Sequence, residues 1–64
     1  MTLEEALLAA QGSVFPGYCL FQSKYFKEWV VSKSHSMDDA ISNDPDPVTA
    51  ILEAVKYVTA RNKN

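Results

Sequence analysis

The strongest structural signal in this chain is a helix start near its C-terminal end, followed by an amphipathic run. Asp46 can accept hydrogen bonds from the free amides of a first helical turn, and Pro47 suits the first helical position. Over residues 48–61 apolar side chains recur at helical spacing, at Ile51, Leu52, Val55 and Val58. The sequence therefore predicts a C-terminal helix with an apolar face that other parts of the chain must cover.

The length of the chain limits how that face can be covered. With 64 residues we expect one domain with a thin core, because small domains bury a smaller share of their surface than large ones. The single cysteine, Cys19, excludes an intramolecular disulfide and a cysteine-based zinc site. Dense packing or self-association must then stabilise the fold, and we expect a homodimer.

The charge of the chain disfavours some partners and locations. A formal net charge of −2 with only six Lys and Arg residues is unsuited to a nucleic-acid backbone, which needs a basic stripe. The N-terminus is acidic where a signal peptide would be basic, and no apolar run reaches the roughly 18 residues that a membrane span needs. We therefore expect a cytoplasmic protein without membrane contacts, and a lone cysteine fits a reducing compartment.

A first helix is predicted at the N-terminus. Thr2 followed three residues later by Glu5 matches a capping box, and Gly12 can end the helix in a left-handed conformation. The predicted helix covers residues 3–11, which is too short to persist in water without packing. The side chains expected to make its contacts are Leu3, Leu7 and Ala10.

The middle of the chain is aromatic and favours strands. Six of the seven aromatic residues fall within residues 15–29. A Pro-Gly turn signal precedes a first strand that starts near Tyr18, residues 22–24 form a polar tip, and residues 26–33 return antiparallel. The alternative is a helix capped by Ser23, because the aromatic and valine residues from position 25 to 30 also fit helical spacing.

A second, shorter helix start is predicted over residues 36–41, and the acid-rich residues 38–46 lead from it into the final helix. The fold class expected is α+β, in the order helix, two-stranded antiparallel hairpin, short helix, C-terminal helix. A small all-α bundle is the alternative. The core residues predicted for the α+β fold are Leu7, Leu20, Phe21, Trp29, Val31, Ile51, Leu52, Val55 and Val58.

Few residues in this chain could carry catalysis. Cys19 and His35 are sixteen positions apart, and a thiol is activated only by a base within hydrogen-bond reach. The four aspartates within residues 38–46 lack the ligand spacing of a calcium loop, and helix capping explains most of them. We therefore expect no enzyme, no cofactor and no metal, and a thiol-dependent enzyme using Cys19 is the last alternative.

The aromatic cluster is the feature that suggests a partner. Only one face of a hairpin can pack on helices, so some aromatic side chains must be exposed or covered by another chain. Because Tyr, Trp and Phe are enriched at protein interfaces, the candidate partner-binding residues are Tyr25, Phe26, Trp29 and Tyr57. The alternative is a single-stranded nucleic-acid binder that combines these aromatic residues with Lys24, Lys27 and Lys33.

A short N-terminal helix, an aromatic middle containing Trp29 and the helix entry Asp46-Pro47-Val48-Thr49-Ala50-Ile51 resemble the small phage-encoded proteins of the ABA-sandwich type. The resemblance is one of layout over most of the chain, with a residue-level match at residues 47–54. It implies a helical layer on a small sheet, an origin on a phage or other mobile element, and no catalytic residues. We therefore expect a small non-enzymatic protein-binding module, such as a phage accessory protein that binds a host protein.

Overall fold

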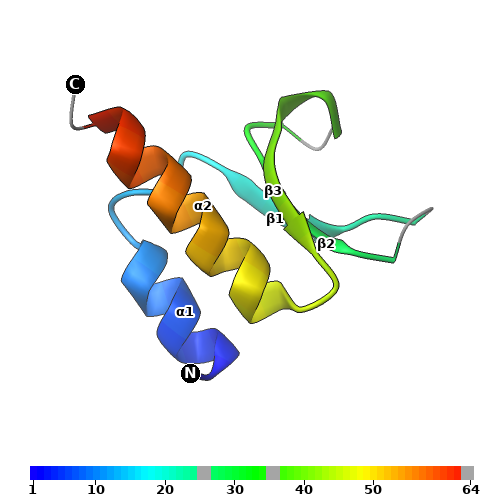
Figure 1. Cartoon of the computed structure of the whole chain (residues 1–64), viewed down its shortest axis with the longest axis horizontal. Coiled ribbons are helices and arrows are strands. Elements are labelled where there is room, and N and C mark those ends of the chain that lie inside the picture. The colour runs from blue at the N-terminus through cyan, green and yellow to red at the C-terminus, as the bar shows by residue number, and fades with distance from the viewer. Residues whose placement is uncertain (25–26, 35–36, 63–64) are drawn as a thin grey trace.

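The computed structural model describes residues 1–24, 27–34 and 37–62 as an α+β fold with two helices and a three-stranded sheet (Figure 1). The predicted α+β class is thereby confirmed. The elements in chain order are α1 (Leu3–Ala10), β1 (Cys19–Gln22), β2 (Trp29–Ser32), a 3-10 turn (Met37–Asp39), β3 (Ala40–Asp44) and α2 (Pro47–Asn62).

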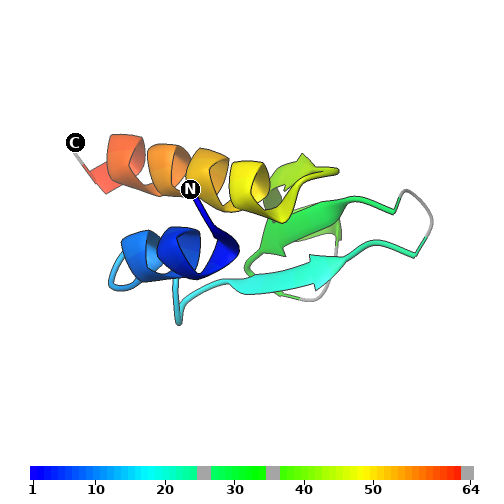
Figure 2. The same cartoon turned by 90° about the horizontal axis from the view of Figure 1, so that it is seen from below.

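The sheet is antiparallel with the strand order β1-β2-β3. Helix α2 packs on β2 and β3, and α1 packs against α2 (Figure 1). Figure 2 shows the two helices running side by side at one end of the molecule, with the β1–β2 hairpin reaching away at the other end. Helix α2 is therefore the element that lies against the sheet, and α1 lies against α2.

The register of the strands tells which residues face the helices. Leu20 and Ser42 are the partners of Val31 on either side of it, so these three side chains share one face. Val31 belongs to the buried core with Ile51, and the Ser42 Oγ donates to the carbonyl oxygen of Ala50 at 2.7 Å. This face therefore lies against α2, and the next residues along each strand face the other way.

Both helices begin as their sequence signals predict. The Thr2 hydroxyl accepts from the Glu5 amide at 3.2 Å, and the Glu5 carboxylate accepts from the Thr2 amide at 2.9 Å, which completes the capping box. Asp46 accepts from the amide and the hydroxyl of Thr49 at 3.2 and 2.9 Å. Gly12 has a φ of 84°, the left-handed conformation expected just after α1.

The predicted hairpin is confirmed, and the alternative helix over the same region is wrong. The tip of the hairpin is not at residues 22–24 as predicted, because Gln22 lies in β1. Cys19–Gln22 and Trp29–Ser32 are antiparallel strands, with Gln22 opposite Trp29. Lys27 closes the turn with a φ of 53°, and its amide donates to the carbonyl oxygen of Ser23 at 3.0 Å. Strand pairing thus prevails over the helical spacing of the ring side chains.

The predicted connection between the hairpin and the final helix is wrong. A single 3-10 turn stands where a short helix was expected, and Ala40–Asp44 forms a third strand. Only Ile41 in this strand is a good strand former, since Asn and Asp are depleted in sheets. Residues 40–44 form a strand because the edge of β2 opposite β1 offers hydrogen-bond partners to their backbone groups. The local residue pattern of this segment does not encode such a partner.

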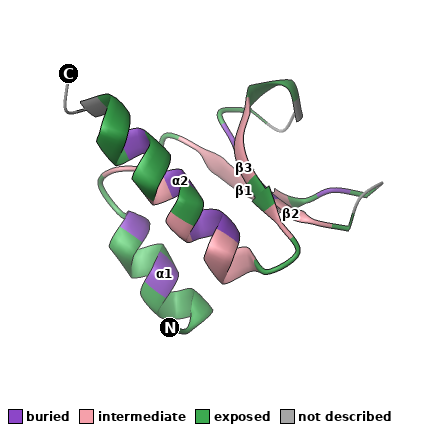
Figure 3. Ribbon diagram, viewed as in Figure 1, coloured by how far each residue is buried: buried purple, intermediate pink, exposed green. Residues whose placement is uncertain are grey.

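The buried face of α1 also differs from the prediction. Ala10, a predicted contact residue, is fully buried together with Ala6, whereas Leu3 and Leu7, the other two predicted contacts, are exposed. Figure 3 shows α1 exposed along most of its length, with only short buried stretches. Two alanines let α1 approach α2 closely, and the larger leucine side chains of α1 lie outside this contact.

The core is richer in alanine than predicted, since four alanines of the described chain are fully buried. Of the nine residues expected there, Val31, Ile51 and Val58 are buried, and Leu20 and Val55 pack half-buried against them. Phe21 and its partner Val30 follow directly on the pair Leu20–Val31, which faces the helices. Because successive side chains of a strand point to opposite faces, Phe21 faces away from the helices. The buried core consists of Ala6, Ala10, Val14, Val31, Ile51, Ala54 and Val58.

Candidate functional site

Strand β3 lies at an edge of the sheet and, within the described residues, pairs only with β2. The Ser23 amide donates to the carbonyl oxygen of Glu28, so this pair of residues is hydrogen-bonded across the hairpin. Hydrogen-bonded and non-hydrogen-bonded residue pairs alternate along antiparallel strands. Phe21–Val30 lies two pairs from Ser23–Glu28, so it is hydrogen-bonded as well, and the amide and carbonyl of Val30 point toward β1. Its partner on β3, Asn43, therefore directs both backbone groups outward, to the free edge.

Two hollows lie along this edge, between β3 and α2. The larger has a volume of about 430 Å³ and the smaller about 270 Å³, and Ile41 and Tyr57 line both. We call the two hollows together the edge groove. The other residues that line it are Ser42, Asn43, Glu53 and Lys56 in the larger hollow, and Tyr18, Lys33, Asp38, Asp39, Ala40 and Arg61 in the smaller.

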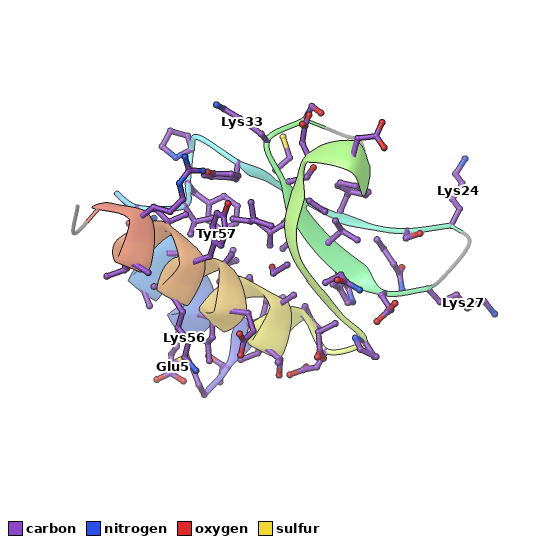
Figure 4. All side chains as sticks on the ribbon, turned by 45° about the horizontal axis from the view of Figure 1, so that its top comes forward. Glu5, Lys24, Lys27, Lys33, Lys56 and Tyr57 are labelled. Carbon is purple, nitrogen blue, oxygen red and sulfur yellow. The ribbon has the colours of Figure 1, made fainter. Side chains whose placement is uncertain are left out.

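Tyr57 is the prominent side chain of the edge groove. It is 41% exposed and is the one aromatic residue among the exposed large apolar side chains of the described chain. Figure 4 shows it projecting from α2 toward β3. The Arg61 guanidinium lies 5.7 Å from the centre of the Tyr57 ring, and its Nη1 donates to the Tyr57 hydroxyl at 3.4 Å. Because residues four apart are neighbours on a helix, Arg61 holds the ring in place.

The charges around the edge groove differ between its two ends. At the larger hollow the Lys56 ammonium lies 3.9 Å from the Glu53 carboxylate, so these two charges offset one another. At the smaller hollow Lys33 and Arg61 stand with two aspartates. Beyond the larger hollow, at the end of β3, stand the carboxylates of Asp44 and Asp46, which accept hydrogen bonds from amides of the turn and of α2. That end of the edge is acidic.

Of the four candidate partner-binding residues, the described structure places Tyr57 and Trp29, and these two lie in different surroundings. Tyr57 lines the edge groove, whereas Trp29 is half-buried in β2, opposite Asp44 on the face that α2 covers. Tyr25 and Phe26 lie outside the described residues. Sequence reasoning missed Ile41 and the backbone of Asn43, because it did not predict the strand that carries them.

The lysines proposed for nucleic-acid binding are spread over the sheet. Lys24 and Lys27 lie at the tip of the β1–β2 hairpin, and Lys33 lies at the other end of β2 (Figure 4). A single strand of nucleic acid needs a continuous basic track beside its stacked bases. The positions of these three lysines do not favour that function.

Of the two groups considered for catalysis, the described structure places only Cys19. Cys19 is half-buried in β1 on the face away from the helices, next along the strand from Leu20, and His35 lies outside the described residues. Among the described residues no three His, Cys, Asp or Glu side chains are close enough to hold a metal ion. Neither helix described here is sufficiently long and apolar to span a membrane.

The edge groove therefore combines a sheet edge with free backbone groups, an exposed aromatic ring held by an arginine, and an apolar side chain from β3. Most of these features are supplied by β3 and α2, while Tyr18, Lys33 and the 3-10 turn complete the smaller hollow. Comparison with protein-family models, with curated proteins and with solved structures found no match to this chain.

Proposed function

We propose that this chain is a small protein-binding module that contacts its partner through the edge groove, with Tyr57 as the anchor of the contact. The observation that carries the proposal is the exposed Tyr57 ring between two hollows beside an unpaired sheet edge. Tyrosine and arginine are enriched among the residues that dominate binding energy at protein interfaces. On the resemblance to phage proteins, the partner is a host protein.

The packing of Tyr57 and Arg61 supports this role. A side chain that is already fixed loses less conformational entropy when a partner covers it, so the same contact binds more tightly. Arg61 restrains the ring through the cation-π contact and the hydrogen bond to the hydroxyl. The apolar side of the contact is completed by Ile41, which lines both hollows.

The experiment is photo-crosslinking in bacterial cells, with benzoylphenylalanine placed at Tyr57 in one variant and at Leu8 in a matched control. Leu8 is 61% exposed on α1 and lies outside the edge groove. We expect a discrete crosslinked protein from position 57 that position 8 does not give. The same adducts from both positions, or none from position 57, would contradict the proposal.

A partner found in this way permits a second measurement. Tyr57→Ala should weaken its binding by about tenfold or more, since an anchoring residue contributes about 1.4 kcal/mol or more to binding. Tyr57→Phe keeps the ring and should retain most of the affinity. Equal affinity of the wild type and Tyr57→Ala would remove Tyr57 from the contact.

A further inference from the structure

We infer that the partner segment is extended and basic, and that it binds by adding a fourth strand to the sheet along β3. The inference rests on the proposed function, since it specifies how a protein partner occupies the edge groove. It commits to a segment of another protein in preference to a second copy of this chain.

The backbone of β3 supplies the first argument. Asn43 directs its amide and its carbonyl away from β2, and its side chain is exposed, so both backbone groups are free to pair. An added strand would satisfy the two groups at once, as strands do when they extend a sheet edge in peptide recognition. The bulge in the β2–β3 pairing lies between Val31 and Ser32, before this position, so the edge is regular at Asn43.

The edge groove supplies the second argument. Side chains of an added strand alternate between the two faces of the sheet, so every second one points to the face that α2 covers. On that face the larger hollow lies directly beside β3, with Ile41 and Tyr57 in its lining. An aliphatic side chain of the partner fits there, while its neighbours in the strand face solvent beside Asn43.

The charges decide between the two kinds of occupant. Asp38 and Asp39 precede β3, and Asp44 and Asp46 stand at its far end. At the start of β3, Asp38 and Asp39 share the smaller hollow with Lys33 and Arg61, so a second copy offers no excess positive charge to the acidic far end, and two chains of net charge −2 repel one another. A Lys or Arg of another protein beside Asp44 and Asp46 is attracted instead.

The decisive variant is Asn43→Pro. Proline is tolerated at an edge strand where the amide faces solvent, so the substitution removes the outward donor without breaking the β2–β3 pairing. The matched control is Asn43→Ala, which removes the side chain and keeps the amide. Thermal unfolding of both variants shows that they are folded before binding is measured.

The probe is a library of random twelve-residue peptides displayed on yeast and selected against the wild-type chain. We expect the selected peptides to be rich in Lys or Arg and in strand-forming residues. They should bind Asn43→Ala like the wild type and bind Asn43→Pro about tenfold more weakly or worse. Exchange of the Asn43 amide hydrogen with solvent should slow when a selected peptide is added.

Each other outcome overturns a defined part of the reasoning. Peptides that lose affinity on Tyr57→Ala but bind Asn43→Pro like the wild type would overturn strand addition and leave the proposed function standing. Peptides whose affinity is unchanged by either substitution would overturn both strand addition and the proposed function. A failure to select any peptide would overturn the inference that the partner segment is extended. A wild-type dimer in analytical ultracentrifugation that Asn43→Pro dissociates would identify the occupant as a second copy and overturn the partner inferred here.

Discussion

Asp46 should be the most informative single position for the stability of this fold, because α2 carries much of the core. Its carboxylate accepts from the amide and the hydroxyl of Thr49 at 3.2 and 2.9 Å, and α2 contributes Ile51, Ala54 and Val58 to the buried core. Asp46→Ala removes both bonds. The Asp46 amide still donates to Asp44, so the turn before α2 keeps its own hydrogen bond.

The magnitude follows from two effects. Loss of an N-cap acceptor destabilises a protein by about 1 kcal/mol, and loss of a negative charge at a helix N-terminus by a further 0.3–1 kcal/mol or so. Together they predict a fall of about 1.5 kcal/mol in the free energy of unfolding. For a domain of this size about 1 kcal/mol corresponds to roughly 4–8 °C, so the midpoint of thermal unfolding should fall by about 6–12 °C.

The assay is urea unfolding followed by far-ultraviolet circular dichroism, with Asp46→Asn as the control. Asparagine keeps an oxygen acceptor at the cap and loses only the charge, so its loss should be the dipole part alone, about 0.3–1 kcal/mol. If Asp46→Ala lost less than about 0.5 kcal/mol, the lower limit for a lost cap, the capping argument would be refuted. Equal losses for the two variants would refute the role of the hydrogen bonds.

Four further predictions concern other parts of the fold. Ile51→Ala should lower the free energy of unfolding by about 2–5 kcal/mol, because Ile51 is fully buried, and an effect as small as a surface substitution would contradict the packing described here. Lys27→Gly should raise the same free energy by about 0.5–1 kcal/mol, since glycine adopts the φ of 53° without strain, and a loss in urea unfolding would contradict this. Ser42→Ala should lower it by about 1 kcal/mol through loss of the bond to α2, and an unchanged urea midpoint would show that this bond contributes nothing. Hydrogen bonds from Thr2 hold the pKa of Glu5 below its usual 4.5, so the charged carboxylate stabilises the fold above pH 4.5 and this stabilisation is lost as the pH falls through the folded-state pKa. The free energy of unfolding should therefore depend less on pH in Glu5→Gln than in the wild type, and identical pH profiles of the two proteins would refute this role of Glu5.

Much of the secondary structure could be predicted because its signals are local. The capping box at Thr2, the cap at Asp46 and the left-handed Gly12 each depend on atoms within a few residues, and all three are present in the structure. The hairpin was predicted from strand-forming composition between two turn signals. The strands are shorter than the sequence predicts, because strand ends depend on where the pairing stops.

The candidate site was predicted only in part. The enrichment of aromatic residues at protein interfaces makes Tyr57 a candidate, and it does line the edge groove. The number of aromatic residues in the hairpin also predicts that some of them are exposed. Among the described residues Trp29 is half-buried instead, because it lies on the face of the sheet that α2 covers.

The sequence by itself determined where the two helices start and that the aromatic middle turns back as a hairpin, since capping atoms, prolines, glycines and strand formers act over a few bonds. Only the tertiary structure decided that Ala40–Asp44 is a strand and that α1 buries alanine while its leucines face outward. The strand exists because the free edge of β2 accepts its backbone, and the Ser42–Ala50 bond ties it to α2. The alanine contact exists because two helices approach closely only where the side chains between them are small. Both choices depend on partners that are distant in the chain, and local residue patterns do not encode such partners.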